Sequence, residues 1–482
     1  MVSDRRRYIF WGLLLIGLLW GARGVGTTEW SGAYDSDLYH FTSVRWAKEY
    51  PAVPGLANLH MPLGLSSLYL LYAAIMDHGL WYRQSAWIVP GIFSVMFFAQ
   101  LVWTWLYAPT TARHLKLFCL LLLAYAALLV SDNVPNLYYD RPAVIAMGLA
   151  ILEFLQLSQP EQATRDRRAG IFTMLLLVAI SIAIKPVGWV LALLLGAWGL
   201  VMARRLPSRC AWLVGIALPL MLAGGLLIRN AILSGWLLYP APYGQLPVAW
   251  AVPANPVPLP GGGLSYSMRN QSALMRAWAR QPGPDYEKRA AQDKSFPWLQ
   301  PWWQRNRHAI ELKLLGAGLL FLLFGCCRRP DGHLFFAVLA VSATLLAWFV
   351  LAPDLRFGEG YFWLWFALTG AMCLSSMVSW RYSMLSAGLW AVLLLMATFP
   401  GWSWPPKITI WHLGHALVSN LRNVQLDNGQ QPPLVVWVPE GDDRCGDAPL
   451  PCTPFPQDAL CCRTPGNIRN GFYLAKPAAT RP

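Results

Sequence analysis

The chain alternates between long apolar runs and short polar segments over most of its length. The apolar runs occupy residues 8–21, 86–107, 115–130, 142–157, 170–184, 187–201, 211–228, 310–325, 333–351, 361–378 and 382–399. A helix needs roughly 20 apolar residues to cross the hydrocarbon layer of a membrane, and tilt or local thinning of the bilayer accommodates shorter runs. The pattern predicts an all-α polytopic membrane protein, a helical bundle of about 11–12 spans.

Short basic loops separate several of these runs and predict their orientation, since such loops stay in the cytoplasm. They contain Arg5, Arg6 and Arg7; Arg113 and Lys116; Arg165, Arg167 and Arg168; Arg204, Arg205 and Arg209; Arg328 and Arg329; and Arg381. Because both flanks of residues 170–201 are then cytoplasmic, we expect this stretch to cross twice and to turn outside at Lys185 and Pro186. If residues 61–76 also crossed the membrane, the basic loop with Arg113 and Lys116 would lie outside. We therefore expect residues 61–76 to form an interfacial or re-entrant helix.

This topology divides the chain into two domains. Residues 1–399 form the transmembrane domain, with external loops at 24–84 and 229–309, and residues 400–482 form a small extracytoplasmic cap. We expect a multi-pass protein of the bacterial cytoplasmic (inner) membrane whose C-terminus is extracytoplasmic.

The composition supports a membrane protein, because 56% of the residues are hydrophobic and only 13% are charged, against about 25% charged residues in soluble domains. The net charge of +14 comes from residues scattered among short loops, which is typical of topology signals and lipid contacts. We therefore exclude nucleic acid as a partner and expect membrane lipid instead. Residues 268–280 predict a basic amphipathic helix suited to lying on phosphates. Three tryptophans mark the interface before the next span: Trp298, Trp302 and Trp303.

The polar segment 32–60 follows the first apolar run. A short helix is expected to begin at Asp35 or Ser36, whose side chains can cap free backbone amides, and to end at Pro51. Such a helix can lie flat at the membrane interface. It holds two candidate catalytic carboxylates, Asp35 and Asp37, either of which could accept a proton from a substrate hydroxyl. The alternatives are a helix cap for Asp35 and an ion pair between Asp37 and a basic residue of its own loop.

Other polar residues on the expected outer side are candidates for substrate binding. They are His40, His60, Asp140, Arg141, Lys185, Arg229, Arg356 and Glu359. Arginine suits bidentate contact with a phosphate, and lysine acts as a point charge. The two histidines could instead be hydrogen-bonded structural residues, Asp140 and Arg141 could pair with each other, and Arg229 could only reach the interface. Asp354, Arg356 and Glu359 could form an ion-pair set within their loop.

Four cysteines cluster in the tail: Cys445, Cys452, Cys461 and Cys462. A structural disulfide between Cys445 and Cys452 is expected if the tail faces an oxidising compartment. A zinc site is the alternative, but the spacings of 7, 9 and 1 differ from paired CxxC knuckles. We assign no metal ligand and leave open a divalent cation as cofactor.

The acidic pair after the first span, the juxtamembrane helix and the later spans with external Arg and Lys resemble the GT-C superfamily of integral-membrane glycosyltransferases, which use polyprenyl-phosphate sugars. In that superfamily the acidic residue of the first loop is catalytic, and the resemblance assigns this role to Asp35 or Asp37. The strings YHFTSVRWAKEYPAVPGLANLH, RNAILSGWLLYP, APDLRFGEG and CGDAPLPCTP also resemble a family of uncharacterised bacterial multi-pass proteins.

The expected function is transfer of a sugar from a polyprenyl-phosphate donor to a cell-envelope acceptor of unknown identity on the outer face of the membrane. One enzymatic alternative is a ligase or polymerase of lipid-linked glycans, which need not use Asp35 or Asp37. Another class is a transporter or flippase of lipid-linked substrates, whose charges would lie within the spans. A non-catalytic assembly subunit with the same fold is the third alternative.

Overall fold

The apolar runs form the long helices of a bundle. Our computed structural model describes residues 2–24, 34–82, 85–131, 136–159, 164–205, 209–256, 267–283, 288, 298–325, 331–376, 384–390, 420–426 and 428–475. The long helices are α1 (Val2–Gly24), α5 (Ser85–Tyr107), α6 (Arg113–Ser131), α7 (Asp140–Leu157), α8 (Thr164–Ile184), α9 (Trp189–Arg204), α10 (Arg209–Ser234), α14 (Ile310–Gly325), α15 (Gly332–Leu351) and α16 (Leu355–Ser375). The predicted run 382–399 falls mostly outside the described residues, of which 384–390 are helical.

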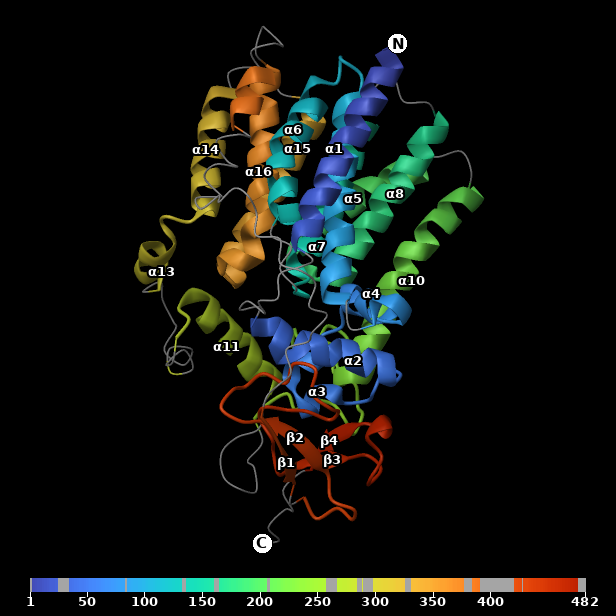
Figure 1. The fold of residues 1–482 in the computed structure, drawn as a ribbon, viewed down its shortest axis with the longest axis vertical. Coiled ribbons are helices and arrows are strands. Elements are labelled where there is room, and N and C mark those ends of the chain that lie inside the picture. Colours follow the sequence, from blue (N-terminus) through green and yellow to red (C-terminus); the bar gives the residue numbers. More distant parts are fainter. Residues whose placement is uncertain are drawn as a thin grey trace.

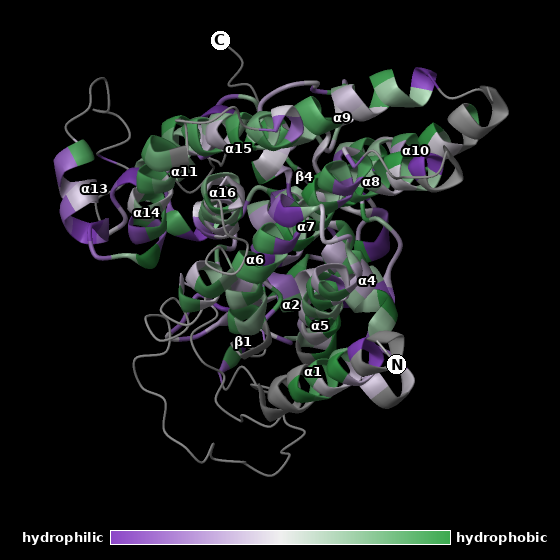
Figure 2. Cartoon of the chain, turned by 90° about the horizontal axis from the view of Figure 1, so that it is seen from above, coloured by the Kyte–Doolittle hydropathy of each residue, from purple (hydrophilic) through white to green (hydrophobic). Residues whose placement is uncertain are grey.

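Among the described residues, five segments of this bundle are long and apolar enough to cross a membrane: Ile88–Tyr107, Arg167–Ile184, Pro186–Arg204, Gly215–Ser234 and Gly332–Leu351. Their apolar surface is only partly buried inside the protein, which suits contact with lipid. Figure 2 shows hydrophobic residues along most helices of the bundle. The structure thus confirms a mostly helical chain and indicates a membrane protein.

Helix α16 occupies the centre of the bundle. It is apolar on all sides and is buried from Gly358 to Leu374 except at Glu359, as expected for a helix surrounded by other helices. Two glycines allow close approach: a Cβ at Gly360 would lie 2.3 Å from Val144 of α7, and one at Gly370 would lie 2.7 Å from Leu121 of α6. Neighbouring helices therefore pack directly against the α16 backbone.

Long helices that short segments connect, such as α5 with α6 and α8 with α9, are antiparallel. The predicted turn at Lys185 and Pro186 is present: α8 ends at Ile184, Lys185 is extended, and a single 3-10 turn, Pro186–Gly188, leads into α9. Figure 1 places the N-terminus at one end of the bundle and the C-terminal strands beyond the other. The starts of α7 and α16 and the α8–α9 turn share the end that faces these strands.

The first loop contains only short helices. They are the π-helix Ser36–His40, α2 (Phe41–Glu49), α3 (Leu56–Leu59), the 3-10 turns Met61–Gly64 and Gly79–Trp81, and α4 (Leu68–Met76). Helix α2 ends before Pro51, as predicted, because the residue before a proline favours extended backbone. Helix α4 has nine residues and is about 14 Å long, too short to cross a bilayer. This length agrees with the interfacial or re-entrant helix expected at 61–76.

The C-terminal cap adds strands that the all-α prediction omitted. Strand β1 (Leu421–Gln425) pairs antiparallel with β2 (Val435–Pro439), and β3 (Leu460–Cys462) pairs antiparallel with β4 (Phe472–Leu474). The cap shares one hydrophobic core with the first loop, in which Trp46, Leu56 and Leu59 pack with Val436 and Phe472. Backbone contacts add to this docking, because Phe472 N donates to Pro54 O at 2.9 Å. The predicted boundary at residue 400 therefore does not separate two hydrophobic cores, because the cap and the first loop share one.

Two helices of the long loop lie beside the bundle, α11 (Met268–Arg280) and α13 (Leu299–Asn306). Helix α11 is present where the sequence predicts it, and the Ser267 hydroxyl caps its start by accepting from Asn270 N. Of the three tryptophans predicted to mark the membrane interface, Trp298 and Trp302 are buried against α15, whereas Trp303 is 53% exposed. The two buried rings anchor α13 to the bundle.

Candidate functional site

Charged residues from three distant segments meet at the end of the bundle that faces the cap. Asp35 of the first loop pairs with Arg356 at the start of α16, with 2.7 Å between carboxylate and guanidinium. Lys185, in the turn between α8 and α9, pairs with Asp140 at the start of α7. The charges of Lys185 and Asp140 also act on Asp35: Lys185 lowers the pKa of its carboxyl group and Asp140 raises it. We call these four residues, Asp35, Asp140, Lys185 and Arg356, the charged cluster.

Local sequence explains how the helix ends bring the cluster together. Pro186 interrupts the α8–α9 hairpin and leaves Lys185 in extended backbone. One turn before it, the Ser181 hydroxyl donates to Ala143 O at 2.7 Å and joins α8 to the first turn of α7. Asp140 lies at the N-terminus of α7, where the helix dipole favours a negative charge.

A second ion pair, from neighbouring positions on α7 and α16, accompanies the cluster. Arg141 lies 3.6 Å from Glu359. The prediction that Asp140 and Arg141 pair with each other is therefore wrong, since each has a partner in another segment: Lys185 in the α8–α9 turn for Asp140 and Glu359 of α16 for Arg141. The proposed ion-pair set within residues 352–360 is also wrong: Asp354 accepts a hydrogen bond from Arg356 N at 2.9 Å, while the Arg356 guanidinium pairs with Asp35.

Aromatic rings enclose the two cations of the cluster. The Lys185 ammonium lies 4.3 Å from the Phe357 ring centre and 5.0 Å from that of Tyr139. The Arg356 guanidinium lies 5.1 to 5.7 Å from the rings of Phe357, Tyr138 and Trp278. Sequence reasoning missed these rings. The signal available was the pair of tyrosines directly before Asp140 and the phenylalanine directly after Arg356.

Opposing influences act on the Asp35 carboxylate. Burial raises its pKa, Arg356 and Lys185 lower it, and Asp140 raises it again, with a net upward shift. No hydrogen bond from its side chain caps the following helix, so the helix-cap alternative is wrong. Asp35 is thus a partly buried carboxylate with a raised pKa that pairs with Arg356 and lies within the electrostatic influence of Lys185.

His40 lies next to the cluster and is almost completely buried, with 1% of its surface exposed. Its Nδ1 lies 3.2 Å from the Ser36 hydroxyl, and its Nε2 has no hydrogen-bond partner among the described residues. Burial, and then the charges of Lys185 and Arg356, lower its pKa well below 6.5. The imidazole is therefore neutral near pH 7.

Asp37 belongs to a different neighbourhood from Asp35. Its carboxylate lies 3.5 Å from Arg444 of the cap, so the prediction of a partner within its own loop is wrong. Burial raises the pKa of Asp37 to about 6, with Arg444 lowering it and Asp442 raising it. The structure separates the two predicted catalytic carboxylates because positions two apart on a helix point in different directions.

Two predicted substrate ligands lie apart from the cluster. His60 is buried between the first loop and the cap with its ring centre 6.0 Å from that of Phe455, and burial lowers its pKa to about 3. Arg229 is half-buried on α10, and no carboxylate of the described residues pairs with it. Neither side chain has a contact with the charged cluster that would bring it into the same site.

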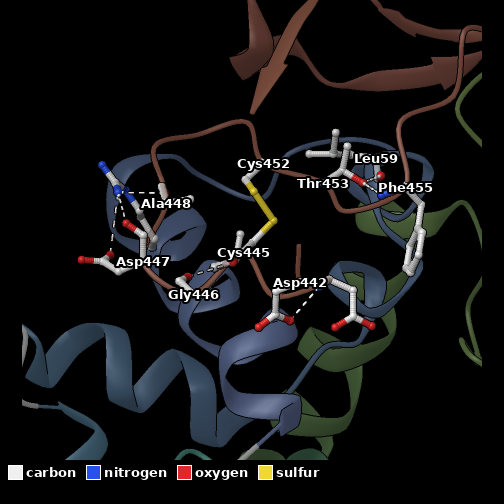
Figure 3. Close-up of a disulfide and its surroundings, with 12 residues drawn as sticks. Leu59, Asp442, Cys445, Gly446, Asp447, Ala448, Cys452, Thr453 and Phe455 are labelled. Carbon is white, nitrogen blue, oxygen red and sulfur yellow. Dashed lines mark hydrogen bonds and ion pairs between the residues drawn. A yellow bond between two sulfur atoms is a disulfide. The ribbon is translucent and has the colours of Figure 1, made fainter. Parts of the chain in front are cut away.

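The cap carries the Cys445–Cys452 disulfide, with the two Cα atoms 6.1 Å apart. Figure 3 shows this loop against the first-loop helices, where Thr453 donates to Leu59 O at 2.9 Å. Cys461 and Cys462 are buried free thiols. Within the described ranges, no group of three or more His, Cys, Asp or Glu residues is arranged to hold a metal ion.

The fold and the site define a helical protein with membrane-length apolar helices and a cluster of charges at one end of its bundle. The chain belongs to the family described as Domain of unknown function (DUF8201), whose model matches residues 3–363. The match includes all four residues of the charged cluster and ends within α16, before the described part of the cap. No curated protein and no solved structure matches the chain.

Proposed function

We propose that this protein is a GT-C-type glycosyltransferase that moves a sugar from a polyprenyl-phosphate donor to a cell-envelope acceptor. The observation that carries the proposal is the Asp35–Arg356 pair beside Lys185, at the end of an apolar bundle. A carboxylate next to two cations matches the two demands of the reaction, which are a base for the acceptor and counter-charges for a phosphate leaving group.

In this mechanism the donor phosphate exchanges with Asp35 as the partner of Arg356. The exchange releases a carboxylate whose pKa burial has raised. The acceptor hydroxyl then attacks the anomeric carbon of the sugar, its proton passes to Asp35, and the bond from that carbon to the phosphate oxygen breaks. The phosphate leaves as an anion held by Arg356 and Lys185, and the anomeric configuration inverts.

The proposed location is the outer face of a bacterial cytoplasmic membrane. The basic residues at the start of α6 and at the end of α9 lie at the end of the bundle opposite the cluster, and short basic loops stay in the cytoplasm. The charged cluster and the C-terminal cap are then extracytoplasmic. The disulfide in the cap suits the oxidising conditions of that side.

The test is a transfer assay with the full chain in proteoliposomes, labelled polyprenyl-phosphate sugars and envelope extracts as acceptor. We expect Asp35→Asn to lower transfer at least about 100-fold, because it removes the base and keeps the side-chain shape. Glu49→Gln is the matched control, since Glu49 is an exposed carboxylate of the same loop that pairs with the half-buried Arg45. Its activity should equal that of the wild type.

Three outcomes contradict the proposal. If Asp35→Asn kept full activity and Asp37→Asn lost it, the catalytic base would be Asp37, on the cap side. Glycan transfer unaffected by either substitution favours a ligase or polymerase of lipid-linked glycans. Movement of the labelled donor across the bilayer without product favours a transporter, although the cluster lies at helix ends and not within the spans.

A further inference from the structure

Helices α11 and α13 present a surface that carries one sign of charge. Residues 268–283 and 298–310 contain five arginines and neither Asp nor Glu. Four of these arginines are exposed, Arg269 and Arg276 on α11 and Arg305 and Arg307 at the end of α13. We call these four the arginine surface. Figure 2 shows α13 at the edge of the molecule, with hydrophilic residues in purple.

Exposed large apolar side chains also lie on these two helices. Met275 is 41% exposed on α11, and Leu299 and Trp303 are 43% and 53% exposed on α13. A helix surface that combines arginine with exposed Trp, Leu and Met is typical of segments that lie in the headgroup layer of a bilayer. The charge attracts anionic headgroups, and the apolar side chains enter the layer beneath them.

The two helices that carry the arginine surface are attached to one end of the bundle. Helix α13 is followed within three residues by α14, and the Trp302 indole donates to Pro353 O at 2.6 Å. The Arg280 guanidinium lies 4.8 Å from the Trp298 ring and so joins α11 to α13. Figure 1 shows both helices below α14 and α16, at the end of the bundle that carries the charged cluster.

Helix α11 also connects this surface to the charged cluster. Trp278 follows Arg276 by two residues, a rotation of about 200° around the helix. It therefore points away from the arginine surface, and its ring lies 5.7 Å from the Arg356 guanidinium. One side of α11 faces solvent with Arg269 and Arg276, and the other contacts the cation that pairs with Asp35.

We propose that the arginine surface docks on the anionic phospholipid headgroups of the surrounding bilayer and that this docking holds Trp278 against Arg356. Docking on the headgroups does not depend on the glycosyl-transfer reaction. An effect of docking on donor binding by Arg356 rests on the proposed function, because it is the proposed mechanism that has Arg356 bind the donor phosphate.

The test is hydrogen–deuterium exchange of the full chain in nanodiscs of phosphatidylcholine or of phosphatidylglycerol. We expect the amides of residues 268–280 to exchange about tenfold more slowly in the anionic discs, because arginines near an anionic surface are attracted to it. High salt should remove this protection, since the Debye length falls from about 10 Å at 0.1 M salt to about 3 Å at 1 M. Amides near Arg356 should also exchange more slowly in the anionic discs, because the proposed docking holds Trp278 against Arg356. Unchanged exchange there would contradict that part of the proposal.

Substitutions in the arginine surface distinguish docking on lipid headgroups from docking on another partner. Arg269→Glu with Arg276→Glu should lose the protection, and the matched double lysine variant should keep it. Arg276→Gln alone serves as a milder variant should the double glutamate variant misfold, and a partial loss is expected. Equal exchange in the two kinds of disc overturns the proposal, as does protection that requires a second protein or scales with protein concentration. The assay needs no catalysis, so loss of transferase activity elsewhere leaves its outcome unaffected.

Discussion

The two carboxylates of the first loop belong to regions with different properties. Asp35 faces the bundle, where it pairs with Arg356 among buried helices and aromatic rings. Asp37 faces the cap, where it pairs with Arg444, whose side chain is 37% exposed and also binds Asp442. The Lys185 and Asp140 side chains of the bundle side are only 17% and 14% exposed, so water reaches the cation Lys185 less easily than Arg444. Similar ion pairs on the two sides should therefore contribute differently to the free energy of unfolding.

The largest difference should appear when one cation is removed from each region. Lys185→Met leaves Asp140 without its partner in a partly buried position and should lower the free energy of unfolding by about 3 kcal/mol. Arg444→Met removes a solvent-exposed partner and should cost about 1 kcal/mol or less. Thermal unfolding of both variants in detergent measures the difference.

A double variant controls for the first of these effects. Adding Asp140→Leu to Lys185→Met removes the isolated charge and should restore most of the lost stability. If Lys185→Met and Arg444→Met are equally mild, the bundle side is as well solvated as the cap side and the contrast between them is wrong.

A smaller effect is expected from the disulfide on the cap side. Replacing Cys445 and Cys452 by Ser opens a loop with a sequence separation of 7 and should destabilise the cap by about 2 kcal/mol. Limited proteolysis of the cap measures the change, with Cys461→Ser as a control that breaks no disulfide. Equal proteolysis of variant and wild type would show that the shared core alone keeps the cap docked.

A last effect concerns the pH dependence of cap docking. Burial raises the pKa of Asp37 to about 6, so the folded chain binds this proton more tightly than the unfolded chain. Its contribution to stability is therefore full below the unfolded pKa of about 4 and is lost as the pH rises through about 6. The groups that face Asp37 are Arg444, which lowers the pKa, and Asp442, which raises it.

Melting of the wild type and of Asp37→Asn between pH 4 and pH 7 tests this dependence. The difference between the two melting temperatures should change across that range, with the wild type losing stability relative to the variant toward pH 7. Parallel curves would contradict a raised pKa of Asp37 in the folded state.

The sequence predicted local elements well and the partners of charged residues poorly. The helix at 268–280, the turn at Lys185 and Pro186, and the end of α2 before Pro51 all follow from contacts within a few residues. The partners of Asp37, Asp140 and Arg141 were predicted nearby and are instead supplied by the cap and by other helices.

By itself the sequence determined where helices form and that long apolar helices would dominate the chain, because side-chain periodicity and proline act on adjacent backbone. Only the tertiary structure decided that Asp35 meets Arg356, that Trp278 contacts the same guanidinium and that the cap completes the core of the first loop. These contacts join segments that are far apart in the sequence. They depend on how whole helices pack, and that packing is set by the summed burial of many side chains rather than by any local pattern.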